Sequence, residues 1–361
     1  MVTNIFGGRY AGRRVLITGH TGFKGSWLAL WLRELGADLS GISLTPENTP
    51  NHWDLLGISL DDYRIDINNA GAVREAVRVA KPDIVFHLAA QSIVRRSYKH
   101  PLETWSTNVM GTAHVLDALR DLDTVKAVVV VTTDKCYENR EWDWGYRETD
   151  RLGGYEPYSA SKAAVELVAA SFRRSFLMAP GAPALATARA GNVIGGGDWS
   201  EDRLVPDLVR AANNGSPLEI RSPYSTRPWQ HVLDSLSGYL ALGSRLLADG
   251  QSRAQAWNFG PEVDGNRTVE SVLNGLQVYW PEMNWEISTG THPHEAKLLY
   301  LDSSKAKTHL GWHPVWSFEQ TLAFTAQWYR HFADTGKALS ATQLAAYIHS
   351  ATDCGVGWAR K

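Results

Sequence analysis

Short apolar runs alternate with segments of helical periodicity along the first half of the chain. The apolar runs have the length of buried strands and end at glycine or polar residues; they cover residues 14–18, 39–44, 83–88, 125–132 and 184–188. Helical patterns occupy residues 27–35, 70–80, 103–119 and 158–176. This alternation predicts repeated βαβ units, and therefore an open, doubly wound parallel sheet with helices on both faces.

The pattern changes after residue 190. Three consecutive glycines at 195–197 and several prolines interrupt it, and helical segments at 233–247 and 318–332 are separated by irregular stretches. We therefore predict a first domain at 1–190 and a smaller α/β lobe at 191–335, whose segments can interleave with the first domain. The pattern assigns no structure to the C-terminal tail at 336–361.

Composition narrows the class of protein. Lys and Arg total 36 against 38 Asp and Glu, so the basic face typical of a nucleic-acid binder is not expected. Two cysteines, Cys136 and Cys354, are too few for a disulfide framework and fit a reducing compartment. The longest apolar stretch, near Val128, is far shorter than the about 20 residues that cross a bilayer. We expect a cytoplasmic globular protein without a membrane partner.

Three glycines follow the first predicted strand and open the first predicted helix. Gly19, Gly22 and Gly25 allow a tight turn and a close approach of the backbone to a pyrophosphate, while the helix N-terminus supplies N–H donors. The strand–turn–helix context predicts a dinucleotide site in the first domain. An acid about 20 residues further on commonly holds the adenosine ribose, but the first acid here is Glu47. No Arg lies between residues 41 and 63 to hold a 2′-phosphate, which favours NAD over NADP.

Tyr158 and Lys162 lie four residues apart on a predicted helix and therefore share one face. An ammonium group near a phenol lowers the pKa of the phenol, and a shift from about 10 towards 7 needs roughly 4 kcal/mol. The lysine together with the positive ring of a nicotinamide could supply that stabilisation. A tyrosine tuned in this way can remove a proton from a sugar hydroxyl.

An acid and an amine stand side by side where the fifth predicted strand ends. Asp134 and Lys135 follow Thr133, and the carboxyl ends of parallel strands border the ligand crevice in open sheets. The pair could serve as a proton donor and a base. A solvated charge pair in a loop is the alternative.

Five segments together resemble the nucleotide-sugar 4,6-dehydratases, within the extended short-chain dehydrogenase/reductases. They lie at 18–27, 91–98, 132–137, 190–199 and 227–232. Lys24 in the glycine turn and Lys135 after Asp134 make the likeness closest to the CDP-glucose 4,6-dehydratases, since the dTDP-glucose and GDP-mannose dehydratases usually place Glu after that Asp. The resemblance spans roughly residues 12–316. It implies a Rossmann-type fold, NAD as cofactor, a nucleotide-sugar substrate (CDP-glucose) and a homodimer or higher homo-oligomer.

The resemblance also implies an internal redox dehydration. Tyr158, assisted by Lys162, takes the C4 hydroxyl proton, and Thr133 hydrogen-bonds the C4 oxygen. Lys135 then removes the C5 proton, and Asp134 protonates the departing C6 hydroxyl. NAD is regenerated within the site, and the product is CDP-4-keto-6-deoxyglucose.

The same resemblance implies two further sets of residues. Those expected to bind the cofactor are Gly19, Thr21, Gly22, Phe23, Lys24, Gly25, Asp66, Ile67, Leu88, Ala89, Ala90, Thr107, Tyr158 and Lys162. Those expected to bind the substrate are Gln91, Ser92, Asn192, Asp198, Trp199, Arg203 and Arg227. Arg203 and Arg227 could instead be ordinary surface charges.

Other functions stay open at this point. The chain could be an inverting UDP-N-acetylhexosamine dehydratase, which also uses Asp-Lys, or a sugar 4-epimerase. It could also be a redox sensor that binds NAD without catalysis. A metal at His292 and His294 is not expected, because no carboxylate or cysteine cluster stands at ligand spacing.

Overall fold

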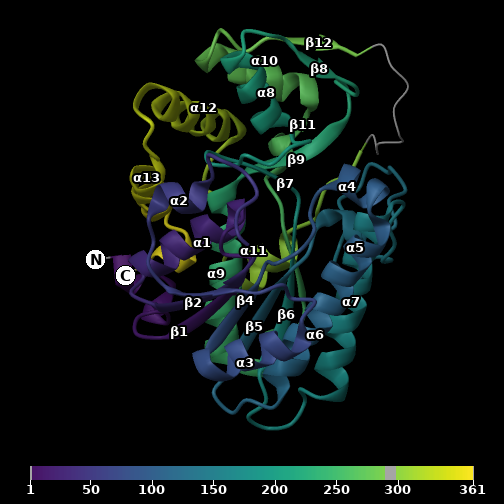
Figure 1. Cartoon of the computed structure of the whole chain (residues 1–361), viewed down its shortest axis with the longest axis vertical. Helices are drawn as coiled ribbons and strands as arrows, with labels where there is room; N and C mark the ends of the chain where they lie inside the picture. The colour runs from purple at the N-terminus through teal and green to yellow at the C-terminus, as the bar shows by residue number, and fades with distance from the viewer. Residues whose placement is uncertain (1, 289–297, 361) are drawn as a thin grey trace.

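The computed structural model describes residues 2–288 and 298–360. Its centre is a seven-stranded parallel sheet in the order β10-β6-β5-β4-β1-β2-β3 (Figure 1). The strands are β1 (Arg14–Thr18), β2 (Asp38–Ser43), β3 (Asp61–Arg64), β4 (Ile84–His87), β5 (Ala127–Val131), β6 (Ala184–Ala190) and β10 (Ala256–Phe259). The predicted doubly wound parallel sheet is confirmed. The strand order reverses between β1 and β4, which is where such sheets bind ligands.

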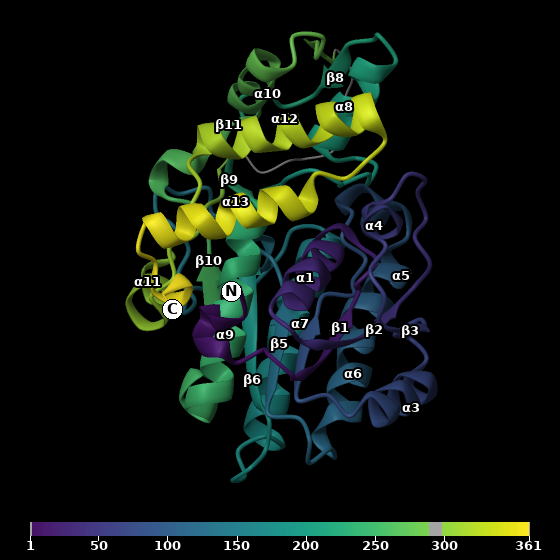
Figure 2. The same ribbon diagram turned by 90° about the vertical axis from the view of Figure 1, so that its left-hand side faces the viewer.

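Helices cover both faces of this sheet (Figures 1 and 2). Because side chains alternate along a strand, Val15 and Ile17 enter one buried cluster whereas Leu16 enters another. The first cluster contains α1 (Phe23–Glu34) and α9 (Val232–Asp249). The second contains α3 (Ala70–Ala80), α6 (Gly111–Arg120) and α7 (Pro157–Ser175).

The segment predicted as one helix at 103–119 has an irregular turn within it. It consists of α5 (Pro101–Trp105), a π-helical turn (Ser106–Met110) and α6. Two further short helices are α4 (Val94–Lys99), which packs on α5, and α2 (His52–Leu56), which packs on α1. π turns are frequent at functional sites, and this one carries Asn108 into a buried position.

A smaller lobe lies beyond the carboxyl ends of the main strands (Figure 1). It contains a three-stranded sheet of β11 (Asn266–Thr268), β9 (Thr226–His231) and β7 (Asn192–Ile194), and a pair formed by β12 (Trp285–Ile287) and β8 (Leu218–Ile220). Its helices are α8 (Leu204–Asn213) and α10 (Val269–Tyr279). The chain passes from this lobe back to the main sheet as α9 and β10, where β10 pairs with β6.

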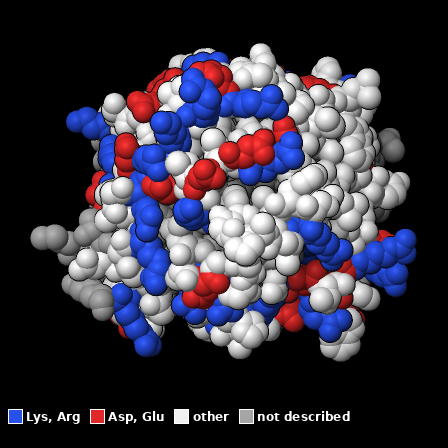
Figure 3. All heavy atoms as spheres, turned by 90° about the horizontal axis from the view of Figure 1, so that it is seen from below, with Lys and Arg blue, Asp and Glu red and all other residues white. Residues whose placement is uncertain are grey.

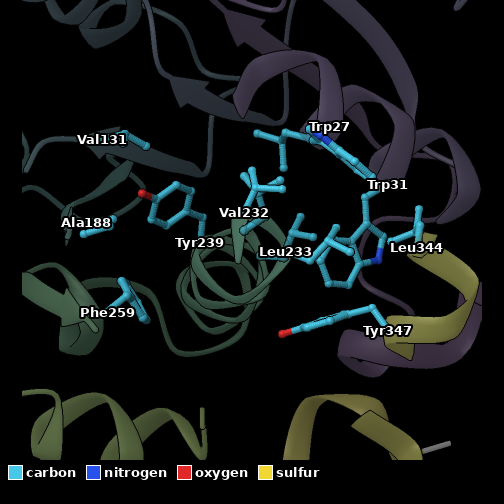
Figure 4. Close-up of a cluster of buried hydrophobic side chains, with 14 of the residues drawn as sticks. Trp27, Trp31, Val131, Ala188, Val232, Leu233, Tyr239, Phe259, Leu344 and Tyr347 are labelled. Atoms are coloured by element: carbon cyan, nitrogen blue, oxygen red, sulfur yellow. The ribbon is translucent and has the colours of Figure 1, made fainter. Parts of the chain in front are cut away.

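The C-terminal segment, to which the sequence assigned no structure, is helical. After α11 (Ser304–Leu310) and α12 (Phe318–Thr335), the chain forms α13 (Ser340–Asp353). Tyr347 and Leu344 of α13 lie beside Trp31 of α1 (Figure 4), and the rings of Trp31 and Tyr347 are 5.6 Å apart. Phe6 stacks on Trp358 with 4.8 Å between ring centroids, so the two ends of the chain lie together.

The surface carries charges of both signs. On the face shown in Figure 3, Lys and Arg side chains interleave with Asp and Glu. This fits the near balance of 36 basic and 38 acidic residues. Within 2–288 and 298–360, every helix is too short or too polar to cross a membrane.

Candidate active site

A large cleft of about 1740 Å³ lies between the carboxyl ends of the main strands and the smaller lobe. A pocket for one small ligand typically has a volume of about 300–1,000 Å³, so this cleft has room for two ligands. All the residues that the sequence predicted for the cofactor, the substrate and the chemistry line it. Their separate roles stay predictions.

The glycine turn lies at the head of α1. Gly19 has a φ of +78°, and a Cβ there would lie 2.8 Å from the backbone nitrogen of Ala89 on the neighbouring strand end. A Cβ at Gly25 would collide with the carbonyl of Gly19. Gly22 caps α1 without a side-chain hydrogen bond, so the first N–H groups of the helix face the cleft without a capping group. The turn thus fits a pyrophosphate.

Side chains on the neighbouring strand ends extend this site towards an adenosine. The Thr21 hydroxyl lies 2.6 Å from that of Ser43 at the end of β2. After β3, Asp66 accepts a hydrogen bond from the backbone of Asn68 at 2.9 Å, and the Asn68 amide donates to Thr107 at 3.2 Å. Asn68 thus joins the predicted cofactor residues Asp66 and Thr107, which come from two parts of the chain.

The charges near the ribose position are already paired. Arg64 directly follows the stretch at 41–63 that contains no Arg. It donates to the Leu44 carbonyl at 3.0 Å and pairs with Asp62 at 2.6 Å. Glu47, the first acid after β2, pairs with Arg96 at 3.2 Å. Because Asp62 neutralises Arg64, the guanidinium is less suited to a 2′-phosphate, in keeping with the preference for NAD.

Tyr158, Thr133 and Lys162 form the centre of the cleft. Burial raises the pKa of the Tyr158 phenol to about 12, and a hydrogen bond with Thr133 offsets only part of this rise. Burial lowers the pKa of Lys162 to about 8, and its ammonium donates to the Val131 carbonyl at 3.2 Å. The expected lowering of the Tyr158 pKa is therefore not a property of the protein alone. It needs the added positive charge of a nicotinamide.

Asp134 and Lys135 lie on a short 3-10 turn (Asp134–Cys136) immediately after β5. Asp134 is 1% exposed and accepts a hydrogen bond from the Thr133 hydroxyl at 2.9 Å. Within the described part of the chain, its second carboxylate oxygen is buried without a hydrogen-bond partner. Lys135 is only half-buried. The acid thus lies deeper than the amine and has one oxygen available to a ligand.

The catalytic helix α7 is fixed at its N-terminus by polar contacts. Glu156 caps the helix, accepting hydrogen bonds from the backbone of Tyr158 at 2.7 Å and Ser159 at 3.0 Å. Asn108 in the π turn accepts from the Gln91 backbone at 2.8 Å and donates to Ser161 of α7 at 2.8 Å. These bonds tie the predicted substrate residue Gln91 to the helix that carries Tyr158.

The smaller lobe adds a second group of polar side chains. Arg203 pairs with Asp198 at 2.9 Å and donates to the Ser92 hydroxyl at 2.9 Å, so it bridges the two sides of the cleft. Arg227 on β9 is 9% exposed, which excludes an ordinary surface charge. Trp199 packs edge-on against Tyr329 and Phe332 of α12.

Comparison with known proteins places these features in a family. A model of the GDP-mannose 4,6-dehydratase family matches residues 16–325. The chain belongs to this family. The membership predicted from the motifs is thereby confirmed.

Relatives of this family agree with the assignment. The chain is 47% identical to the CDP-glucose 4,6-dehydratase of Salmonella typhimurium, over 89% of this chain and 91% of that protein. Among solved structures, the fold is similar to that of a double mutant of the dTDP-glucose 4,6-dehydratase of Streptomyces venezuelae with NAD bound. The TM-score is 0.73 and the identity 26%, over 88% of this chain and 96% of that one. The UDP-glucose 4-epimerase of Thermotoga maritima shares the fold, at a TM-score of 0.76, 22% identity, and coverage of 88% and 99%.

Several polar residues around the site of this family member were missed by sequence reasoning. Glu156 had a local signal, because an acid before Pro157 is typical of a helix cap followed by proline at the first helical position. Asn108 and Tyr239 had none. Tyr239 of α9 accepts a hydrogen bond from the Lys24 ammonium at 3.2 Å, across 215 residues of sequence.

His292 and His294 lie outside the described residues. In the part of the chain that the structure describes, no group of three or more His, Cys, Asp or Glu side chains could hold a metal ion.

Proposed function

We propose that this chain is an NAD-dependent CDP-glucose 4,6-dehydratase, which converts CDP-D-glucose to CDP-4-keto-6-deoxy-D-glucose and water. The observation that carries the proposal is the shared cleft: the glycine turn, the Tyr158–Thr133 pair and the Asp134–Lys135 turn all line it. The 47% identity to a CDP-glucose 4,6-dehydratase supports the choice of nucleotide.

The cofactor fits the turn at the head of α1. Gly19, Gly22 and Gly25 leave room for a pyrophosphate beside the helix N-terminus, and Asp66 and Thr107 border the adenosine side. When bound, NAD supplies the reversible redox chemistry that makes C4 a ketone and later reduces C6. Its positive ring also favours the ionised form of a nearby phenol.

The residues of the chain move the protons. The Tyr158 phenolate takes the proton of the C4 hydroxyl, and Thr133 hydrogen-bonds the C4 oxygen. A ketone at C4 acidifies the hydrogen at C5, which Lys135 removes as the base and returns to C5 when C6 is reduced. Asp134 donates a proton to the C6 hydroxyl, which leaves as water. One oxygen of Asp134 is buried without a hydrogen-bond partner within the described residues, so it can bond to that hydroxyl.

The smaller lobe binds the nucleotide in this proposal. Arg227 and Asn192 hold the diphosphate, to which a buried guanidinium can make strong charge-assisted hydrogen bonds. Arg203, Asp198 and Trp199 border the ribose and base. In this proposal residues 1–190 form the dinucleotide domain, and residues 191–335 supply the substrate lobe except for α9 and β10, which pack on and extend the main sheet. Residues 336–361 form a packed tail.

Product analysis tests the activity. Purified protein with NAD is incubated with CDP-glucose and, separately, with UDP-N-acetylglucosamine. We expect the alkali-induced absorbance of a 4-keto sugar only with CDP-glucose, a product lighter by roughly one water, and no net reduction of NAD. Turnover of UDP-N-acetylglucosamine, an isomer without loss of water, or NAD binding without any turnover would each refute the proposal.

We further propose that the protein is cytoplasmic and forms a homodimer. Both cysteines are free, one buried and one exposed, as expected in a reducing compartment.

Large apolar side chains are exposed on α5, the π turn and α7, which pack together: Leu102, Trp105, Met110 and Leu167. Such a patch is typical of an interface. Light scattering should give twice the mass of the chain, and Leu102→Glu should yield the monomer; a wild-type monomer would refute the dimer.

A further inference from the structure

A buried ion pair lies under the active site but outside the cleft. Arg189 of β6 pairs with Glu166 of α7 at 2.8 Å, and their side chains are 4% and 3% exposed. Neither residue lines the cleft. Burying two charges is unfavourable unless they are well paired and hydrogen-bonded. A buried pair at this position therefore suggests that it serves the active site.

The pair acts on Lys162. Glu166 follows Lys162 by one turn of α7, and both side chains are buried. Burial alone would raise the pKa of the Glu166 carboxyl, but Arg189 and the hydrogen bonds of two threonines hold it below its ordinary value, so the carboxylate stays charged. Burial lowers the pKa of Lys162 to about 8, and the negative charge of Glu166 opposes this lowering.

The pair also holds both ends of the turn that carries Asp134 and Lys135. On one side, the Thr132 hydroxyl donates to Glu166 at 2.5 Å. On the other, Arg189 donates to the Tyr137 hydroxyl at 2.7 Å, and its guanidinium lies 4.9 Å from the centre of the Tyr137 ring. Tyr137 in turn donates to Asn258 of β10 at 2.7 Å. Thr132 and Tyr137 bracket residues 133–136, so the ion pair fixes the turn from below.

We infer that the Glu166–Arg189 pair is a positioning unit for the catalytic centre: it holds the charge on Lys162 and anchors the turn of Asp134 and Lys135. The inference rests on the proposed function. The charged and titratable groups around Lys162 come from five elements, namely Tyr158 and Glu166 on α7, Cys136 after β5, His87 on β4, Lys24 on α1 and, behind Glu166, Arg189 on β6. Asp134 acts on Tyr158, Cys136 and Lys24, whereas Glu166 is the carboxylate whose charge acts on Lys162.

Competitive acylation tests the effect on Lys162 without any substrate. NAD-loaded protein is labelled with acetic anhydride between about pH 6 and about pH 10, and the modification of Lys162 is read by mass spectrometry. In the wild type we expect a midpoint below that of an exposed lysine, because burial lowers the pKa of Lys162. Glu166→Gln should move the midpoint down by about one pH unit, because the opposing negative charge is lost.

A matched variant separates the effect of the Glu166 charge from the effect of losing one of its hydrogen bonds. The Thr187 hydroxyl donates to the same carboxylate at 2.7 Å. Thr187→Val therefore removes one hydrogen bond but keeps the charge, and should lower the Tm while leaving the labelling midpoint in place. An unchanged midpoint in Glu166→Gln, or an equal shift in Thr187→Val, would overturn the role assigned to the charge.

A second pair of variants tests the anchoring of the turn and does not depend on the stability of Glu166→Gln. Tyr137→Phe removes the hydroxyl that joins Arg189 to Asn258, and should lower kcat for CDP-glucose about tenfold with little change in KM. Tyr146→Phe is the control, since the Tyr146 ring stacks on that of Tyr137 at 5.1 Å but its hydroxyl bonds to the 139–140 loop. Unaltered kcat in Tyr137→Phe, or an equal loss in both, would refute the anchoring.

These outcomes can be told apart from failure of the proposed function. If the wild type does not convert CDP-glucose, the proposed activity is wrong, and the labelling midpoints still decide whether Glu166 holds the charge on Lys162. If the wild type converts CDP-glucose but neither Glu166→Gln nor Tyr137→Phe behaves as described, only the role of the Glu166–Arg189 pair is refuted.

Discussion

The buried carboxyl of Asp234 predicts a specific pH dependence of the free energy of unfolding. It lies in the first turn of α9 and is fully buried. One carboxylate oxygen accepts hydrogen bonds from the Val315 backbone at 2.6 Å and the Tyr347 hydroxyl at 2.7 Å. The other oxygen is buried and has no partner within the described residues. Burial raises the pKa of Asp234 to about 7, and the hydrogen bonds offset only part of the rise.

The sign of the pH dependence follows from this shift. Because the folded state raises the pKa of Asp234 from 3.8 to about 7, folding favours the protonated carboxyl. Its contribution to stability is complete below the unfolded pKa and is lost as the pH rises through the folded pKa. A shift of about 3 units corresponds to about 4 kcal/mol in total, of which about 2.5 kcal/mol is lost between about pH 5 and about pH 8.

Asp234→Asn should remove this loss. The Asn carbonyl can accept the same two hydrogen bonds, and the unpaired amide adds a cost that does not depend on pH. The free energy of unfolding in urea should therefore rise by about 2.5 kcal/mol relative to the wild type between about pH 5 and about pH 8. Asp264→Asn, which removes an exposed carboxylate, is the control for loss of an acid as such. A difference between Asp234→Asn and the wild type that stays constant with pH would refute the reasoning.

Other substitutions test the site and the packing. Tyr158→Phe should lower turnover of CDP-glucose about 10³-fold while NAD still binds, as measured by product absorbance and by NAD titration; near wild-type turnover would contradict the role of the phenol. Arg227→Gln should raise KM about tenfold or more, because a buried charge-assisted hydrogen bond is lost; an unchanged KM would place the diphosphate elsewhere. Gly196→Ala should lower stability by about 1–3 kcal/mol in thermal unfolding, since its Cβ would collide with the Trp328 ring, and an unchanged Tm would contradict that contact. Gly71→Ala, in the open first turn of α3, should instead stabilise by about 0.5–1 kcal/mol, and a loss would contradict the open space.

The sequence predicted the main sheet because its strands are buried on both faces. β5, which is entirely apolar and fully buried, forms a continuous run that periodicity detects. The three-residue strands β7 and β11 are partly exposed and carry no such run. Their pairing with β9 is set by tertiary contacts over long sequence separations. The irregular turn within the predicted helix at 103–119 has no clear signal in the residues either.

The candidate site divides in the same way. The glycine turn and the Tyr158–Lys162 spacing are local, so the sequence predicts them directly. The partners of these groups come from far along the chain: Tyr239 meets Lys24 across 215 residues. The spacing gave no sign that burial raises the pKa of the Tyr158 phenol, against which Lys162 and a bound nicotinamide must act. Spacing reveals which side chains share a face but not how much water the fold removes from them.

The distribution of charge in and below the cleft shows what the burial of these groups does for ligand binding. Below the cleft, Arg189 is neutralised by Glu166. Within it, Lys24 is half-buried, and loss of hydration, followed by the charge of Arg203, lowers its pKa to about 7, although Asp134 and Asp198 oppose the lowering. Lys162 is likewise lowered to about 8 by burial. Cations with lowered pKa values mark a place where an anion would relieve an electrostatic cost. The pyrophosphate of a dinucleotide on the glycine turn is an anion suited to the place beside Lys24.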